Sequence, residues 1–261
     1  MTEQAPWLLT DEPAPGVTRI TLNRPEQFNP LSGDMLEAMQ HTLNALAANP
    51  ACRVVLLAAT GKAFCAGHDL REMRAQPDEA FYRALFAQCS AMMLTIQRMP
   101  QPVIALVQGV ATAAGCQLVA MCDLALAVPQ AKFAVSGINY GLFCSTPSVG
   151  VSRAMGRKQA LEMLLTGDFI DAAEAARRGL INRVVPDTEL ANEALALAQK
   201  IVAKPAVAVA MGKSLFYRQL EAPIAQAYQD AEATMACNMM DEDAQEGFLA
   251  FLEKRQPNFT R

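Results

Sequence analysis

The sequence predicts an α/β protein with a largely parallel sheet and a helical C-terminal end. Three short apolar runs, at 53–58, 102–107 and 123–128, are rich in Val, Leu and Ala, which is typical of strands buried on both faces. Segments of helical pattern separate these runs, and that alternation is typical of parallel strands joined by crossover helices. From Ser145 onward the pattern is mostly helical.

The N-terminal segment predicts a β-hairpin followed by a helix. Apolar residues at 7–10 and 17–22 flank a Pro- and Gly-containing loop at 11–16. Ser32 then precedes a helical pattern over 33–48 and is expected to cap it. The other elements expected before residue 145 are a loop at 60–69, a helix at 80–99, a loop of small residues at 109–115, a short helix at 114–121 and a strand at 132–135.

The C-terminal third predicts a short helix, a last strand and a helical end. A turn is expected at 166–167, a helix at 171–178 closed by Gly179, and a strand at 181–185. Helical patterns then cover 189–203, 206–220, 222–239 and 243–254. We divide the chain into a core at 1–200 and a helical region at 201–261, whose Ala and Met side chains need a surface to pack on. Oligomerisation through that region is expected.

The composition excludes several classes of protein. Of 261 residues, 52% are hydrophobic and 18% charged, which excludes a disordered chain. The net charge of −4 and the lack of a basic run argue against a nucleic-acid partner. Seven cysteines without a CxxC pair indicate reduced thiols, and with only two histidines no metal site is expected. No signal-peptide pattern or long apolar span is present, so we expect a soluble, cytoplasmic protein with no membrane partner.

In the segment at 103–121, a buried strand leads through small residues directly into a helix. The first N–H groups of that helix lack internal partners and lie at the positive end of its dipole. Ala113, Ala114 and Gly115 leave them accessible, which suits a negatively charged ligand oxygen. Tight packing of helix on strand is the competing interpretation, and composition alone slightly favours it. The segment lacks the patterns of a P-loop or a dinucleotide fingerprint, and the chain contains no GxSxG elbow.

The loop at 61–72 is the second segment that could bind a negatively charged oxygen. It also follows a buried strand and supplies small residues and two glycines. His68 lies where backbone N–H groups could face the same space, although a lone histidine is more often structural. Asp69 is expected to cap the segment after it, and Glu72 to point outward.

Five segments in order resemble the crotonase (enoyl-CoA hydratase/isomerase) superfamily over nearly the whole chain. They are ITLNRPEQFNPLS, KAFCAGHDL, IALVQGVATAAGCQLVAMCD, LLTGDFIDAAEAARRGLINRVV and EGFLAFLEKRQPNF. The stretches ATAAGCQL and GLFCST are most similar to the enoyl-CoA hydratase domain-containing subgroup. The resemblance implies a ClpP-like superhelix of β-β-α units. It also implies C-terminal helices that form trimers, which often pair into hexamers.

The resemblance further implies a site for a coenzyme A thioester, with no metal and no separate cofactor. The backbone N–H groups of His68 and Ala114 would hold the thioester oxygen of an enolate. Arg24 and Arg71 match positions near the nucleotide and phosphates, and Lys254 matches a lysine that often reaches a neighbouring subunit's coenzyme. The remaining residues expected around the bound coenzyme are Ala66, Gly67, Asp69 and Gly115.

The chain departs from the family at both positions where hydratases carry a catalytic glutamate. These positions hold Gln117, which cannot take a proton at neutral pH, and Gly137. The family implies an acyl-CoA enzyme, nominally an enoyl-CoA hydratase, and three alternatives stay open. It could be a decarboxylase or isomerase with another proton donor, or a hydratase that recruits bicarbonate, for which Val135 replaces the supporting glutamine. It could also be a non-catalytic acyl-CoA binder. Asn139, Tyr140, Cys144 and Ser145 could line the acyl pocket, and for Tyr140 and Cys144 packing is the expected role.

Overall fold

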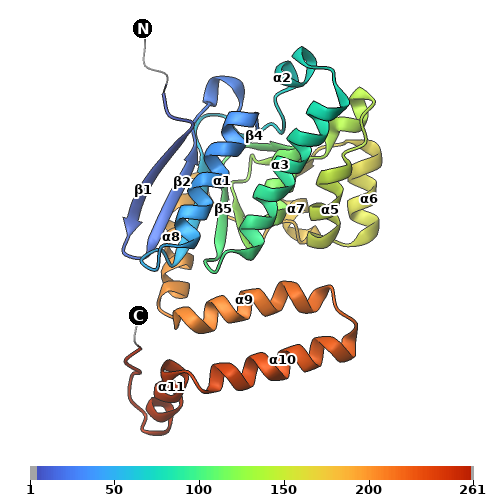
Figure 1. Cartoon of the computed structure of the whole chain (residues 1–261). Coiled ribbons are helices and arrows are strands. Elements are labelled where there is room, and N and C mark those ends of the chain that lie inside the picture. The colour runs from blue at the N-terminus through green and yellow to red at the C-terminus, as the bar shows by residue number, and fades with distance from the viewer. Residues whose placement is uncertain (1–4, 260–261) are drawn as a thin grey trace.

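The computed structural model describes residues 5–259 and contains two sheets (Figure 1). The larger sheet has the strand order β1-β2-β3-β5-β7-β10. Its strands are β1 (Leu8–Ala14), β2 (Val17–Leu22), β3 (Val54–Ala59), β5 (Val103–Val107), β7 (Leu124–Ala127) and β10 (Arg183–Val184). The β1–β2 hairpin is antiparallel and every other pair in this sheet is parallel. The predicted α/β class and parallel core are therefore confirmed.

The smaller sheet corrects two of the predicted loops. It contains β4 (Ala63–Cys65), β6 (Val110–Thr112), β8 (Lys132–Ala134) and β9 (Ile170–Asp171) in that order. The loops expected at 60–69 and 109–115 thus contain β4 and β6, which at three residues each are too short to show a periodic pattern. Gly109 makes the approach possible, because a Cβ there would lie 2.0 Å from the Lys62 carbonyl oxygen.

The chain passes three times from the larger sheet to the smaller one and then into helical structure. β3 leads to β4, β5 to β6, and β7 to β8. The first two passages end in α2 (Leu70–Ala75) and α4 (Ala114–Met121), and the third in a 3-10 turn at Ser136–Tyr140 before α5 (Ser145–Ala154). This repetition is the β-β-α superhelix that the sequence predicts.

The other helices follow the predicted order with small shifts. They are α1 (Gly33–Ala47), α3 (Glu79–Arg98), α6 (Arg157–Thr166), α7 (Ala172–Arg178), α8 (Leu190–Val202), α9 (Ala206–Leu220), α10 (Ile224–Met239) and α11 (Glu242–Leu252). The cap of α1 is confirmed, because the Ser32 hydroxyl accepts a hydrogen bond from Met35 N–H. Gly179 closes α7 with a φ of 88°, as predicted.

The hairpin and one short helix differ from the prediction. β1 continues to Ala14, so the expected loop at 11–16 is reduced to its last two residues. A cross-strand pair accounts for this, since Arg19 donates to both carboxylate oxygens of Asp11 at 2.8 and 2.6 Å. Helix α2 has no counterpart among the predicted elements. Six residues are too few for a clear helical period.

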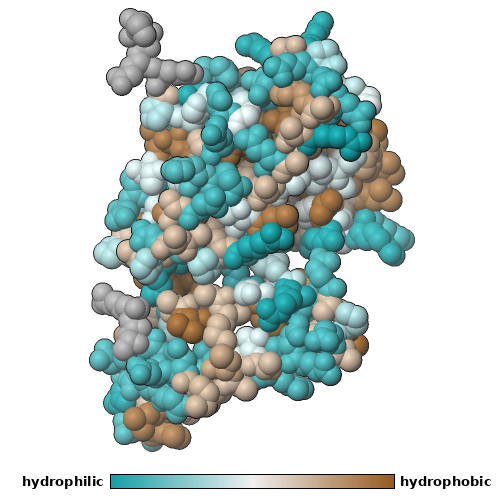
Figure 2. All heavy atoms as spheres, viewed as in Figure 1, coloured by the Kyte–Doolittle hydropathy of each residue, from teal (hydrophilic) through white to brown (hydrophobic). Residues whose placement is uncertain are grey.

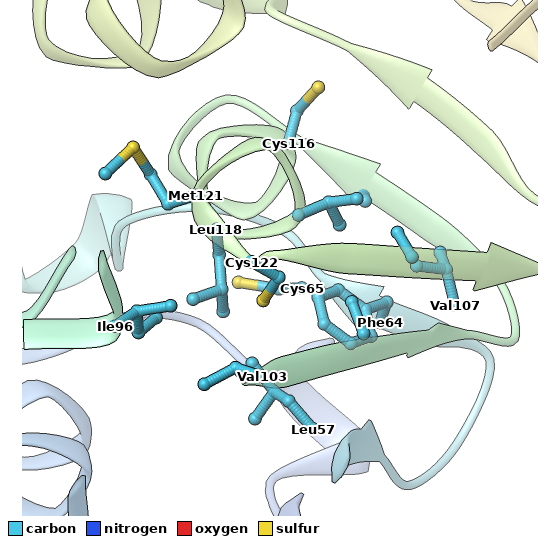
Figure 3. Packing of buried hydrophobic residues seen from close by; sticks show 14 of the residues in the cluster. Leu57, Phe64, Cys65, Ile96, Val103, Val107, Cys116, Leu118, Met121 and Cys122 are labelled. Carbon is cyan, nitrogen blue, oxygen red and sulfur yellow. The ribbon is translucent and has the colours of Figure 1, made fainter. Parts of the chain in front are cut away.

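The space between the two sheets is filled by fully buried apolar side chains. Leu57 and Val103 from the larger sheet meet Phe64 from the smaller one and Leu118 from α4 (Figure 3). Each is at most 1% exposed. Such close packing holds the ends of β4 and β6 in a fixed relative position. Those two ends carry the residues of the candidate site.

The helices at 206–252, α9 to α11, form a C-terminal arm beside the two-sheet body (Figure 1). Helix α8 packs on β2, β3, β5 and β7, whereas α9 and α10 contain no buried apolar residue. Apolar surface remains on the arm among polar side chains (Figure 2). It includes Ile224, Tyr228, Met235, Phe251 and Leu252, all more than half exposed.

No single described helix has the length and apolar content of a membrane span. One bent pair, 187–202 with 206–220, meets both criteria only when taken together, across a bend of 104°. Within that pair, α8 covers the larger sheet and α9 carries the buried charge of Lys213. Both features fit helices that pack on the protein's own core.

A buried ion pair joins the C-terminal arm to the body. Lys213 Nζ on α9 donates to Asp123 Oδ2 at 2.7 Å and to the carbonyl oxygens of Ile96 and Gln101 at 2.7 and 2.8 Å. Tyr217 OH donates to the other carboxylate oxygen of Asp123 at 2.8 Å. Burial raises the pKa of Asp123 and lowers that of Lys213, while the contact between the two groups opposes both shifts. The full set of hydrogen bonds favours the charged pair.

Removing the cation is predicted to destabilise the fold strongly. Lys213→Met leaves the Asp123 carboxylate buried without its partner and two carbonyls without a donor. We expect the free energy of unfolding to fall by about 3–5 kcal/mol, measured by urea denaturation. Lys158→Met, at an exposed position, is the control and should leave stability nearly unchanged. Equal stability of the two variants would contradict the assignment.

Candidate active site

The ends of β4 and β6 meet at a cavity of about 260 Å³. Four of the predicted site residues line it: Ala66, His68, Ala114 and Gly137. Tyr140, Cys144 and Ser145 also line it, as predicted, whereas the apolar part of the wall was not anticipated from the sequence. Its apolar side chains include Leu70, Met73, Phe86, Leu142, Phe143 and Pro147. No Asp, Glu, Lys or Arg occurs among the described residues that line it.

Two backbone N–H groups are available at this cavity. His68 follows β4, and Ala114 is the first residue of α4, so its N–H has no partner within the helix. Neither N–H donates to any acceptor in the part of the chain that the structure describes. The two segments are in contact, because a Cβ at Gly67 would lie 3.2 Å from Ala114 N. Gly67 permits this approach because it has no side chain, and its φ of +91° is one that glycine adopts readily.

Ala113 holds the start of α4 in a strained conformation. Its φ of 51° and ψ of −120° are unusual for a residue with a side chain. Its own N–H donates to the Ala134 carbonyl oxygen at 2.9 Å, which anchors it to the smaller sheet. A strained backbone conformation costs free energy, so it persists only where the surrounding structure enforces it. Such residues are concentrated at functional sites. Here it lies immediately before the Ala114 N–H.

The His68 side chain is held in one tautomer. Nδ1 lies 3.1 Å from the Leu31 carbonyl oxygen, which can only accept, so Nδ1 carries the hydrogen. Nε2 is therefore an acceptor, and it is buried without a hydrogen-bond partner in the described structure. Burial lowers the pKa of the imidazole. The ring also lies 5.4 Å from the ring of Phe86, measured between centroids.

Gln117 and Gly115 lie beside the cavity but do not line it. Gln117 is 4% exposed, and its Cγ would be 3.5 Å from a Cβ placed on Gly150 of α5. Its Oε1 is buried and accepts no hydrogen bond from a described residue. A Cβ at Gly115 would lie 2.1 Å from the Cys65 carbonyl oxygen. Gly115 thus serves close packing of α4 on β4, while Ala114 faces the cavity.

Gly137 lines the cavity, yet the structure leaves no room for a side chain there. A Cβ at this position would lie 2.6 Å from the Leu142 carbonyl oxygen and 2.7 Å from Cys144 Sγ. Cys144 is 6% exposed, and burial raises the pKa of its thiol. Tyr140 lines the cavity, as predicted, but it is 79% exposed, so the predicted packing role does not hold for this residue. The position where the resemblance implies a glutamate is therefore closed by the segment that follows it.

The three cationic residues proposed for the coenzyme lie outside the cavity lining. Arg24 is buried, its guanidinium donates to the carbonyl oxygens of Ala5 and Pro6, and it lies 3.9 Å from the Trp7 ring centroid. Arg71 and Lys254 are exposed on the surface. Their contact with a coenzyme stays a prediction.

The capping role of Asp69 is confirmed, and the outward direction of Glu72 is wrong. Asp69 Oδ1 accepts from the N–H groups of Arg71 and Glu72 at the start of α2. The Glu72 carboxylate instead accepts from Gly33 N–H at the start of α1, at 3.1 Å. A carboxylate at that helix N-terminus is stabilised by the helix dipole, a long-range contact that sequence spacing does not reveal. No group of three or more His, Cys, Asp or Glu side chains among residues 5–259 could hold a metal ion.

Comparison with known proteins supports the same class. The family model described as enoyl-CoA hydratase/isomerase matches residues 12–261, so the chain belongs to this family, also called the crotonase family. A solved structure of an enoyl-CoA hydratase from Mycobacterium smegmatis is 60% identical with a TM-score of 0.97, over 98% of this chain and 100% of that one. The crotonase fold predicted from the sequence is confirmed.

Two further relatives belong to the predicted subgroup. The mitochondrial enoyl-CoA hydratase domain-containing protein 3 of Xenopus laevis is 44% identical over 94% of this chain and 83% of its own length. The solved structure of the human protein of that name is 41% identical with a TM-score of 0.94, over 97% of this chain and 100% of that chain. A probable enoyl-CoA hydratase of Mycobacterium tuberculosis is 35% identical over 92% of this chain and 93% of its own length.

The contact between the two segments can be tested with a pair of glycines. Gly67→Ala and Gly141→Ala both place a side chain at a φ near +80 to +90°, which costs about 1–2 kcal/mol in each. A Cβ at Gly67 would also lie within 4 Å of Ala113 and Ala114, whereas a Cβ at Gly141 would have no neighbour within 4 Å. We expect Gly67→Ala to lose about 1–3 kcal/mol more stability than Gly141→Ala in chemical denaturation. Equal losses would mean that the segments are not in contact.

Proposed function

We propose that this protein is an acyl-CoA enzyme that binds the thioester oxygen between the N–H groups of His68 and Ala114. The observation that carries the proposal is that both N–H groups lack an acceptor and belong to residues lining one cavity. Fixed donors of this kind stabilise the negative charge of an enolate without reorganisation, and each contributes about 10²–10³-fold to the rate. Because the donors are backbone groups, Ala114 need not be glycine.

Hydration by two carboxylates is not supported by this site. Gln117 cannot exchange a proton at neutral pH, and its side chain packs toward α5. Gly137 is enclosed by Leu142 and Cys144, so a glutamate there would displace the chain around it. We therefore propose chemistry that needs an enolate and at most one other proton-transferring group. A family member of this kind would carry the hydratase name without the usual hydratase mechanism.

The charge of the lining favours an uncharged acyl group. A malonyl-type substrate would place a second carboxylate in a cavity whose described lining has no cationic side chain. Burying an unpaired charge is costly, whereas an alkyl or alkenyl chain gains from contact with Leu70, Met73 and Phe86. This favours enoyl-CoA and related thioesters over the decarboxylase alternative.

The oxyanion assignment predicts the effect of removing one donor. Ala114→Pro deletes the N–H at the first position of α4, and because proline restricts the strained Ala113 before it, circular dichroism must first verify the fold. We expect turnover of acyl-CoA to fall by about 10²–10³-fold. The control is Ala114→Gly, which keeps the N–H and should keep the activity. A folded Ala114→Pro variant with full activity would refute the proposed site.

Assays of the unmodified protein separate the remaining alternatives. Hydration of crotonyl-CoA at several bicarbonate concentrations tests a recruited base, and malonyl-CoA and methylmalonyl-CoA test decarboxylation. Calorimetric binding of crotonyl-CoA, measured alongside, tests for a non-catalytic binder. Binding without turnover of any thioester, including isomerisation of 3-enoyl-CoA, would favour the binder.

We also propose that the protein forms a trimer or a pair of trimers through the C-terminal arm. Its support is the exposed apolar surface of α10 and α11, which includes Ile224, Tyr228 and Phe251. Light scattering of the native protein should give three or six chains, and Tyr228→Asp with Phe251→Asp should reduce that number. A native monomer would contradict this proposal. A cytoplasmic location likewise remains our proposal.

A further inference from the structure

Four large, mostly apolar side chains that line the cavity remain exposed to solvent. They are Leu70, Tyr140, Leu142 and Phe143, between 38% and 79% exposed, and we call them the apolar mouth. We propose that the apolar mouth binds the far part of a long acyl chain, so that the protein prefers thioesters such as dodecanoyl-CoA over butanoyl-CoA. The inference rests on the proposed binding of the thioester oxygen between the N–H groups of His68 and Ala114.

The lining of the cavity passes from a buried part to an exposed part. Ala114, which carries one of the proposed donors, is 1% exposed, and Cys144 in the same lining is 6% exposed. The apolar mouth belongs to this lining as well, yet most of its surface is open to solvent. A chain held by its thioester in the buried part would therefore extend along the apolar mouth as it lengthens.

Helix α2 presents only apolar side chains to the cavity. Leu70 and Met73 belong to the lining, and because they are three positions apart they lie on one face of the helix. The charged residues of α2, which are Arg71, Glu72 and Arg74, are not among the described residues that line the cavity. The helix is thus amphipathic, with its uncharged face toward the proposed chain.

Hydrogen bonds to backbone groups hold both contributing segments in place. On α2, the Met73 carbonyl oxygen accepts a hydrogen bond from Tyr82 OH at 3.0 Å. In the segment after β8, Leu142 N–H donates to the Gly137 carbonyl oxygen at 3.0 Å. These bonds leave the side chains of Leu70 and Leu142 free to contact a ligand. A surface that is ordered before binding loses less conformational entropy when a ligand arrives.

An alkyl chain is the occupant that fits the position and the charge of the apolar mouth. The C-terminal arm lies at the opposite end of the molecule from α2, so the subunit contact that we propose uses another surface (Figure 1). The apolar mouth lines the same cavity as the proposed thioester site, and the described lining has no charged side chain. A chain attached to the thioester meets both conditions. Each methylene removed from water raises affinity by up to about fourfold.

The native protein is tested by calorimetric titration with butanoyl-CoA, octanoyl-CoA and dodecanoyl-CoA. The apolar mouth is open on one side, so each added methylene is only partly removed from water and should contribute about twofold. Over eight additional methylenes, dodecanoyl-CoA should bind at least about 100-fold more tightly than butanoyl-CoA. Octanoyl-CoA should lie between the two.

The double variant Leu70→Ser with Leu142→Ser removes one apolar side chain from each segment of the apolar mouth. Both side chains are more than half exposed, so the fold should be kept, and circular dichroism verifies it. We expect the ratio of the affinities for dodecanoyl-CoA and butanoyl-CoA to fall by at least about tenfold. The matched control is Leu165→Ser on α6, an exposed leucine outside the described lining, which should keep the native ratio.

The outcomes distinguish this inference from the proposed function. A native protein that binds butanoyl-CoA and dodecanoyl-CoA equally would overturn the role of the apolar mouth and leave acyl-CoA binding intact. A double variant that loses affinity for both thioesters by the same factor would assign the apolar mouth to the coenzyme and overturn it too. The same holds for a variant that keeps the native ratio, including one with fewer chains by light scattering, which would indicate a subunit contact. A native protein that binds no thioester of any length would remove the proposed function itself.

Discussion

The site depends on backbone segments that approach each other without intervening side chains. Gly109 lies against Lys62, Gly115 against Cys65, and Gly67 against the Ala113–Ala114 pair. At the first two, a single Cβ would come within 2.1 Å of a carbonyl oxygen, a distance that no packing adjustment of side chains can relieve. These close approaches let the smaller sheet pack directly on α4. As a result, N–H groups from two separate segments of the chain meet at one cavity.

A site made of backbone donors separates binding from proton transfer. The donors of the proposed oxyanion site are the backbone N–H groups of His68 and Ala114, so Gln117 and Gly137 at the positions expected to hold glutamates would leave both donors present. Proton transfer, in contrast, belongs to side chains and must be supplied again for each reaction. At Gly137 the change cannot be reversed by one substitution, because Leu142 and Cys144 occupy the space. Leu142 and Cys144 fill the space that a side chain at position 137 would need.

The sequence predicted what depends on local pattern and missed what depends on distant contacts. Long strands, the Ser32 and Asp69 caps and the Gly179 terminus were predictable because each is determined by neighbouring residues. Strands β4 and β6 were missed since three residues carry no period, and their pairing is specified across the fold. The apolar wall from Leu70, Met73 and Phe86 was missed for the same reason. The Glu72 carboxylate reaches α1 across 39 positions of sequence.

The buried ion pair and the cavity lie in different parts of the molecule. Asp123 and Lys213 lie where the C-terminal arm meets the body, with each donor and acceptor matched, and they are separate from the lining of the acyl cavity. Among the described residues that line the cavity there is no Asp, Glu, Lys or Arg, so its wall suits the uncharged acyl chain that we propose as its ligand. The buried charges of Asp123 and Lys213 instead join the arm to the body, where each finds an opposite charge within hydrogen-bond distance. A charge without such a partner would be costly in the apolar cavity, which is why a charged acyl group is disfavoured there.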